Sequence, residues 1–118
     1  MIRGIKKVTP NKVIEHVDGI HPNAYSEEIK LKWISALDGM VKKLVMQEDD
    51  VKPYSYPEDM DKELLIPFPF DDLYGMYIES MIDFYNKEYG NYNNSATMFE
   101  EKYREYKKAY IREHTAKR

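Results

Sequence analysis

The stretch that decides the fold is Leu73–Tyr89, which reads LYGMYIESMIDFYNKEY. Apolar residues recur through it at helical spacing in two adjacent series. The first series is Leu73, Tyr77, Met81 and Phe84, and the second is Tyr74, Ile78, Ile82, Tyr85 and Tyr89. Because only a narrow polar strip remains, the helix must be covered on several sides. We therefore predict a central helix that begins at Asp71-Asp72, with the first series (Leu73, Tyr77, Met81, Phe84) as candidate core.

Two further helices are predicted upstream of this stretch. Thr9 is a suitable N-cap and Pro10 suits the first helical position, so a short helix follows and ends at Gly19. Ser26 caps the next helix, which we expect to continue to Leu44. Its apolar stripe is Ile29, Trp33, Leu37, Met40, Val41 and Leu44, of which Trp33 and Leu37 are candidate core residues.

Downstream, Gly90 and the run Asn91–Ser95 predict a break, with Asn94 or Ser95 capping the last helix. Aromatic residues then recur at helical spacing: Phe99, Tyr103, Tyr106 and Tyr110. A tyrosine face suits a core edge or a subunit contact, because each hydroxyl needs a hydrogen-bond partner. We take Tyr103, Tyr106 and Tyr110 as candidate interface residues.

A long acidic connection over residues 48–70 separates the two helical halves. Four of the six prolines lie in it, and residues 48–72 carry a net charge of −7. Strands are plausible only here, at Lys52–Tyr56 and Glu63–Ile66, so the connection has room for a short β-hairpin. The sequence predicts one mainly α domain over residues 1–118, with about four helices.

Composition excludes several classes of protein. The net charge of −3 argues against a general polyanion binder, and the absence of cysteine excludes disulfide scaffolds and thiolate metal sites. No apolar run approaches the roughly 18 residues of a membrane helix, so we expect no membrane partner. Tyrosine is unusually frequent, with 11 residues.

Motifs for catalysis or metal binding are missing from the sequence. His16, His21 and His114 lie in separate segments without metal-ligand spacing. Glu79 and Asp83 share a helix face, which we interpret as a solvated polar strip. Asp59, Asp61 and Glu63 alternate as in a calcium loop but lack its glycine and final glutamate. The basic residues near the C-terminus fit a helix end and a solvated tail: Lys107, Lys108, Arg112, Lys117 and Arg118. We predict no enzyme activity, no cofactor and no metal.

Aromatic and proline residues alternate in Ile66-Pro67-Phe68-Pro69-Phe70. We expect Phe70 to pack in the core and Phe68 to contact another molecule, because an aromatic ring on stiff backbone loses little entropy on binding. Tyr54 and Tyr56 complete the candidate interface.

Four stretches together resemble small phage and prophage proteins of Gram-positive bacteria. They are Ser26–Glu28 leading into Lys32-Trp33, Glu63–Pro67 followed by Asp71–Tyr74, Ile82–Tyr89, and Tyr92–Ser95. Members of that group resemble the head–tail connector (adaptor, head-completion) proteins of long-tailed phages. The likeness extends from about Val13 to His114.

The resemblance implies a small α-helical protein that forms a ring beneath the portal and joins the head to the tail. Its partners would be copies of itself and phage portal or tail proteins, and DNA would pass it without sequence-specific binding. It would work in the host bacterial cytoplasm during assembly and then in the virion. A further hypothesis places the acidic connection against the DNA channel, where like charge prevents sticking.

Two other functions stay open from the sequence. One is a small helical regulatory or DNA-associated protein of a mobile element. The other is an all-α hydrolase that uses Glu79 and Asp83 with a divalent ion.

Overall fold

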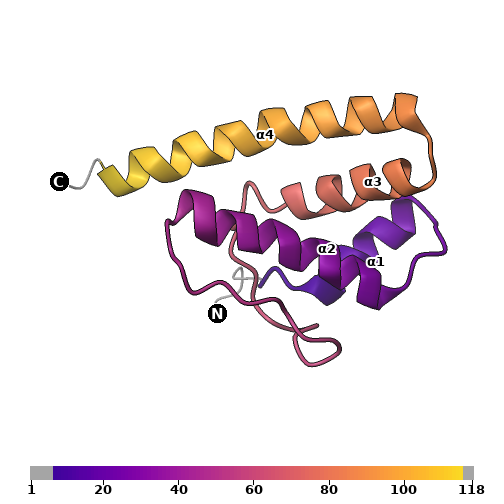
Figure 1. Ribbon diagram of the computed structural model, residues 1–118, viewed down its shortest axis with the longest axis horizontal. Helices are drawn as coiled ribbons and strands as arrows, with labels where there is room; N and C mark the ends of the chain where they lie inside the picture. Colours follow the sequence, from indigo (N-terminus) through magenta and orange to yellow (C-terminus); the bar gives the residue numbers. More distant parts are fainter. Residues whose placement is uncertain (1–6, 116–118) are drawn as a thin grey trace, which may run out of the picture.

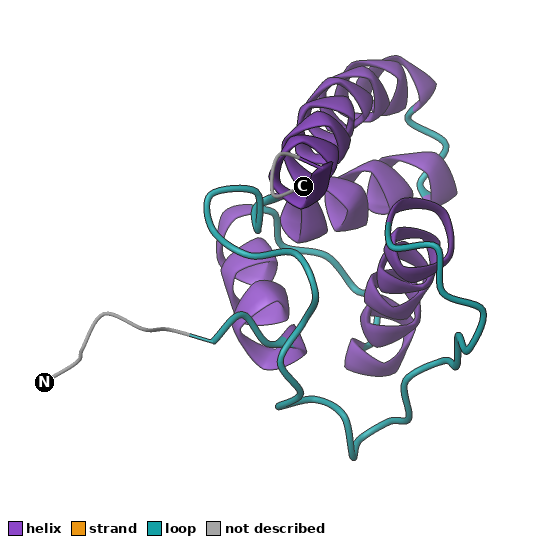
Figure 2. Cartoon of the chain, turned by 90° about the vertical axis from the view of Figure 1, so that its left-hand side faces the viewer, coloured by secondary structure: helices purple, strands orange, loops and turns teal. Residues whose placement is uncertain are grey.

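The computed structural model describes residues 7–115, and these residues form helices joined by loops (Figures 1 and 2). The helices are α1 (Pro10–Ile20), α2 (Glu27–Met40), the short π-helical turn η1 (Val41–Val45), α3 (Leu73–Tyr85) and α4 (Tyr89–Thr115). Helix α4 lies along α3, and α1 and α2 contact α3 from its other side (Figure 1). The prediction of a mainly α domain with about four helices is confirmed.

Side-chain caps start the first two helices where the sequence predicts. The Thr9 hydroxyl accepts a hydrogen bond from the backbone N–H of Lys12, and Pro10 occupies the first turn. The Ser26 hydroxyl accepts from the N–H of Ile29, and Glu27 and Glu28 follow in the first turn, where carboxylates favour the helix dipole. Both starts are therefore fixed by local chemistry.

Helix α3 lies at the centre of the core, but its two apolar series are not buried equally. Leu73, Tyr74, Ile78 and Ile82 are fully buried, whereas Tyr77 and Met81 are only partly buried. Placing Phe84 in the core was wrong: it is 44% exposed. The reason is its position at the end of α3, where its ring packs against the rings of Tyr85, Tyr89 and Tyr92 near the turn into α4.

Helix α2 buries a wider face than the predicted stripe. Trp33, Leu37 and Val41 are buried as predicted, whereas Ile29 and Leu44 at the ends of the stripe are exposed. Four residues outside the stripe are also buried: Lys30, Leu31, Ile34 and Asp38. The acidic connection contacts this helix at Ser35 and Asp38, and Asp18 of α1 pairs with Lys30, so two further segments cover sides of α2 outside the stripe.

The predicted break before the last helix was wrong, because α4 runs without interruption from Tyr89 to Thr115. Contacts with α3 hold its first turns: the Ser95 hydroxyl donates to Asp83 at 3.0 Å, and the Tyr92 ring packs on Phe84. Further along, Phe99 and Tyr106 are buried against the core. Tertiary packing thus overrides the weak helix propensity of the asparagine run.

The acidic connection does not form the short β-hairpin for which it has room, since residues 7–115 contain no strand (Figure 2). The connection is attached to the helices instead. The N–H of Asn11 donates to the carbonyl of Met60 at 2.9 Å, and the N–H of Leu64 donates to the carbonyl of Val8 at 2.8 Å. Met60, Leu64 and Ile66 are buried, so this segment contributes to the core.

Candidate docking site

A buried carboxylate fixes the acidic connection to the helices. Asp38 of α2 accepts hydrogen bonds from the hydroxyls of Tyr54 (2.6 Å) and Tyr74, and from the N–H of Leu65 (3.2 Å). The Tyr74 hydroxyl in turn accepts from the N–H of Ile66 at 2.8 Å. One carboxylate therefore joins α2, α3 and both ends of the connection.

Burial determines the ionisation of this network. It raises the pKa of Asp38 above its ordinary value, although the Tyr54 and Tyr74 hydroxyls and the Leu65 N–H oppose the rise by donating to the carboxylate. Burial, with the neighbouring carboxylate, also raises the pKa of both Tyr54 and Tyr74, so both remain neutral donors. The network is a structural brace, and it positions the segment that follows Ile66.

Beyond this brace, the chain presents Phe68 to solvent. Phe68 lies between two prolines and is 83% exposed, the largest exposed fraction among the large apolar side chains of the described chain. Its neighbour Phe70 turns inward and packs on Tyr106, with ring centroids 5.6 Å apart. The two phenylalanines thus lie on opposite sides of this segment.

A groove of about 750 Å³ lies beside Phe68, between α1 and the start of α3. We call it the Phe68 groove. Its apolar lining includes Val8, Val13, Gly75 and Met76 together with Phe68. Its charged residues separate by element: Lys7 and Lys12 belong to the α1 side, and Asp71, Asp72 and Glu79 to the α3 side. The groove therefore combines an apolar surface with walls of opposite charge, as protein-binding sites commonly do.

The candidate interface tyrosines do not gather at this groove. Tyr54 is half-buried in the Asp38 brace, and Tyr56 is 40% exposed on the loop. Tyr106 is only 3% exposed and burial raises its pKa to about 12, so its assignment to an intermolecular interface was wrong. Tyr103 and Tyr110 are half-buried. The tyrosine face of α4 covers this chain's own core, because α3 lies directly beneath it.

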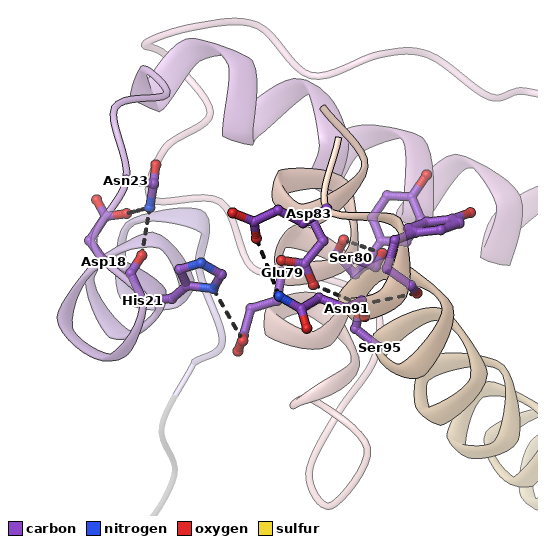
Figure 3. A network of polar contacts seen from close by, with 11 residues as sticks. Asp18, His21, Asn23, Glu79, Ser80, Asp83, Asn91 and Ser95 are labelled. Carbon is purple, nitrogen blue, oxygen red and sulfur yellow. Dashed lines mark hydrogen bonds and ion pairs between the residues drawn. The ribbon is translucent and has the colours of Figure 1, made fainter. Parts of the chain in front are cut away.

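The carboxylates on α3 take part in polar contacts between helices (Figure 3). Oε1 of Glu79 lies 3.5 Å from Nδ1 of His21, which follows the last residue of α1. Asp83 is only 6% exposed, and its carboxylate accepts a hydrogen bond from the Ser95 hydroxyl. The prediction of a solvated strip was therefore wrong for Asp83, since α4 covers it. Within residues 7–115, no group of three or more His, Asp or Glu side chains could hold a metal ion.

A similar polar contact lies between α1 and α2, and Figure 3 labels two of its residues, Asp18 and Asn23. The Lys30 ammonium is almost fully buried and donates to Asp18 at 2.6 Å, while the Asn23 amide donates to the same carboxylate at 3.1 Å. The apolar pattern of α2 does not indicate that Lys30 is buried. The one available hint in the sequence is that Lys30 lies between Ile29 and Leu31, with the acidic Asp18 on the preceding helix.

Comparisons with known proteins identify no relative. No family model matches the chain, no curated protein matches it, and no solved structure matches its fold. Among the described helices, none is both long enough and apolar enough to cross a membrane.

Proposed function

We propose that this chain is a structural assembly protein, similar to the head–tail connectors of long-tailed phages, that forms or joins a ring between portal and tail. One observation carries the proposal: Phe68 is 83% exposed on a braced segment beside an apolar groove. An exposed aromatic ring on rigid backbone beside an apolar groove is a favourable binding anchor, because little entropy is lost when it binds. On this proposal the protein acts in the host bacterial cytoplasm and then in the virion.

A second exposed aromatic group supports a head-to-tail contact between subunits. Phe84, Tyr85 and Tyr89 are 44%, 53% and 54% exposed at the turn from α3 to α4. Phe68 precedes α3, so the two aromatic surfaces lie at opposite ends of this helix. A contact that joins two different surfaces is heterologous, and heterologous contacts close into rings when the rotation between subunits fits.

The walls of the Phe68 groove would set the orientation of the neighbour. Basic side chains on one side and acidic side chains on the other disfavour a reversed partner, because like charges would then face each other. Phe68 would supply the binding energy and the charged walls the specificity.

The experiment compares Phe68→Ala with Phe70→Ala. The mass of each variant is measured in solution by light scattering, alone and with a purified phage portal ring, and its melting temperature is recorded. We expect Phe68→Ala to weaken ring formation or portal binding with little change in melting. Phe70→Ala is the matched control, which should lower the melting temperature because its ring packs on Tyr106. Equal melting losses, or unchanged assembly of Phe68→Ala, would contradict the proposal.

A DNA-associated regulatory protein is the second candidate, favoured by Lys107, Lys108 and Arg112 near the end of α4. This function predicts that the mobility of a DNA fragment shifts on binding and that the affinity falls steeply with salt. The assembly function predicts no such shift, because the chain carries an excess of negative charge. The same preparation, mixed with DNA at two salt concentrations, separates the two functions.

A further inference from the structure

The outer face of α4 is exposed along most of the helix. It lies opposite the tyrosine face and consists of seven exposed residues at helical spacing: Met98, Glu101, Arg104, Glu105, Lys108, Ile111 and Arg112. Met98 is 60% exposed and Ile111 is 57% exposed, so two large apolar side chains lie in water near its two ends. The last part of α4 also extends beyond α2 and α3 (Figure 1).

Charges of both signs alternate along this face. Its charged residues are, in chain order, Glu101, Arg104, Glu105, Lys108 and Arg112. Glu101 and Glu105 lie four residues apart, as do Arg104 and Lys108, and like charges at this spacing repel each other on a helix. Among residues 7–115, no ion pair involves any of these side chains. Within the described chain, these charged side chains are therefore available to pair with a second molecule.

An antiparallel copy of the same face would pair four of these five charged residues with opposite charges. With Met98 placed opposite the partner's Ile111, Glu101 falls opposite the partner's Lys108 and Glu105 opposite the partner's Arg104. Two-fold symmetry repeats each contact, as in isologous dimers. A parallel arrangement would instead place each charge opposite its own kind, so the sequence of charges favours the antiparallel one.

A groove beside this face suits the apolar end of the partner helix. It measures about 520 Å³ between α3 and α4 and is lined by Phe70, Met76 and Met98, with acidic side chains around them. The only basic side chain in its lining, Lys102, already pairs with Asp72 at 3.1 Å. Ile111 has Lys108 and Arg112 close by on the same face, so a basic helix end meets an acidic, apolar groove.

We propose that α4 pairs antiparallel with α4 of a second copy, giving a two-fold dimer of the free protein. The proposal goes beyond the connector function, because this pairing requires neither a portal nor a ring. Contacts between Met98 of one copy and Ile111 of the other lie at the two ends of the paired segment. The ion pairs Glu101–Lys108 and Glu105–Arg104, each formed twice, set the register between them.

Charge reversal tests the register. Glu101→Lys and Lys108→Glu should each weaken the dimer by about tenfold or more, measured as the dissociation constant in sedimentation velocity, because each places like charges opposite each other twice. A mixture of the two single variants should form a heterodimer, since every reversed charge then meets its complement. The double variant Glu101→Lys/Lys108→Glu should recover the homodimer. Glu113→Lys, on another side of α4, is the control and should leave the dimer unchanged.

Cysteine cross-linking tests the direction, and the natural chain contains no cysteine to interfere. Met98→Cys mixed with Ile111→Cys should form a disulfide-linked dimer under mild oxidation. Neither variant alone should do so, because residues 13 positions apart on a helix are separated by about 20 Å, far beyond disulfide reach. Dimers from Met98→Cys alone would indicate parallel pairing and overturn the proposal.

A wild-type protein that stays monomeric over a dilution series, or a dimer insensitive to Glu101→Lys, would also overturn it. These outcomes leave the proposed function untouched, since Phe68→Ala tests that separately. Conversely, loss of ring or portal binding in Phe68→Ala with an intact α4 dimer would support both.

Discussion

The Tyr74 hydroxyl donates a hydrogen bond to the carboxylate of Asp38, which joins the first turn of α3 to α2 inside the core. The same hydroxyl accepts from the N–H of Ile66, and the same carboxylate accepts from Tyr54 and Leu65. Since each group makes more than one contact, the network aligns two helices and the acidic connection simultaneously.

Tyr74→Phe should lower the free energy of unfolding by about 2–3 kcal/mol, because it removes the hydroxyl and leaves buried groups unpaired. Tyr103→Phe is the matched control, since the buried Tyr103 hydroxyl has no hydrogen-bond partner within the described chain. Its removal should be neutral or stabilising. Urea unfolding of both variants measures the change in unfolding free energy. Equal losses for the two variants would show that the hydrogen bond between Tyr74 and Asp38 does not stabilise the fold.

Protonation of Asp38 should contribute to the pH dependence of the unfolding free energy. Its pKa in the folded state is raised by burial above the ordinary value of 3.8, so the folded protein holds this proton more tightly than the unfolded chain does. The stabilisation is therefore complete below the ordinary pKa and is lost as pH rises through the folded pKa. Asp38→Asn removes this contribution.

The measurement is the difference in unfolding free energy between wild type and Asp38→Asn from about pH 3.5 upward, a range that starts near the ordinary pKa of aspartate. We expect the advantage of the wild type to be largest at the acidic end and to shrink as pH rises. An advantage that grows with pH would mean that the ionised carboxylate is the form stabilised by folding.

Trp33→Ala should cost about 3–5 kcal/mol, the range for removing a large buried aromatic side chain. Trp33 is 8% exposed, and its ring lies between Tyr25 and Tyr85 at centroid distances of 5.6 and 5.9 Å. Thermal or urea unfolding measures the loss. Tyr85→Ala should cost less, because Tyr85 is 53% exposed, and a cost below about 1 kcal/mol for Trp33→Ala would contradict this packing.

Local signals in the sequence predict the helices, whereas contacts distant in sequence decide the rest. Thr9 and Ser26 cap their helices with their own hydroxyls, which a sequence pattern can reveal. The nearest hydrogen-bond partner of Asp38 is Tyr54, 16 residues away in the sequence. Lys30 pairs with Asp18, 12 residues away. No local sequence rule identifies such partners. The exposed Phe68 follows from its two flanking prolines, but the groove beside it depends on how α1 packs on α3.

The start of α4 supplies the last prediction. Glycine in a helix costs up to about 1 kcal/mol relative to alanine, and a Cβ added at Gly90 would have no atom within 4 Å. Because Gly90 lies inside α4, in its first turn, Gly90→Ala should raise the free energy of unfolding by about 0.5 kcal/mol. If the chain instead broke at the asparagine run, alanine would bring no helical gain. Amide hydrogen exchange at Asn93, Asn94 and Ser95 distinguishes these cases: protection comparable to that of Thr97 supports a continuous helix, and fast exchange confined to the run would show that α4 begins after it.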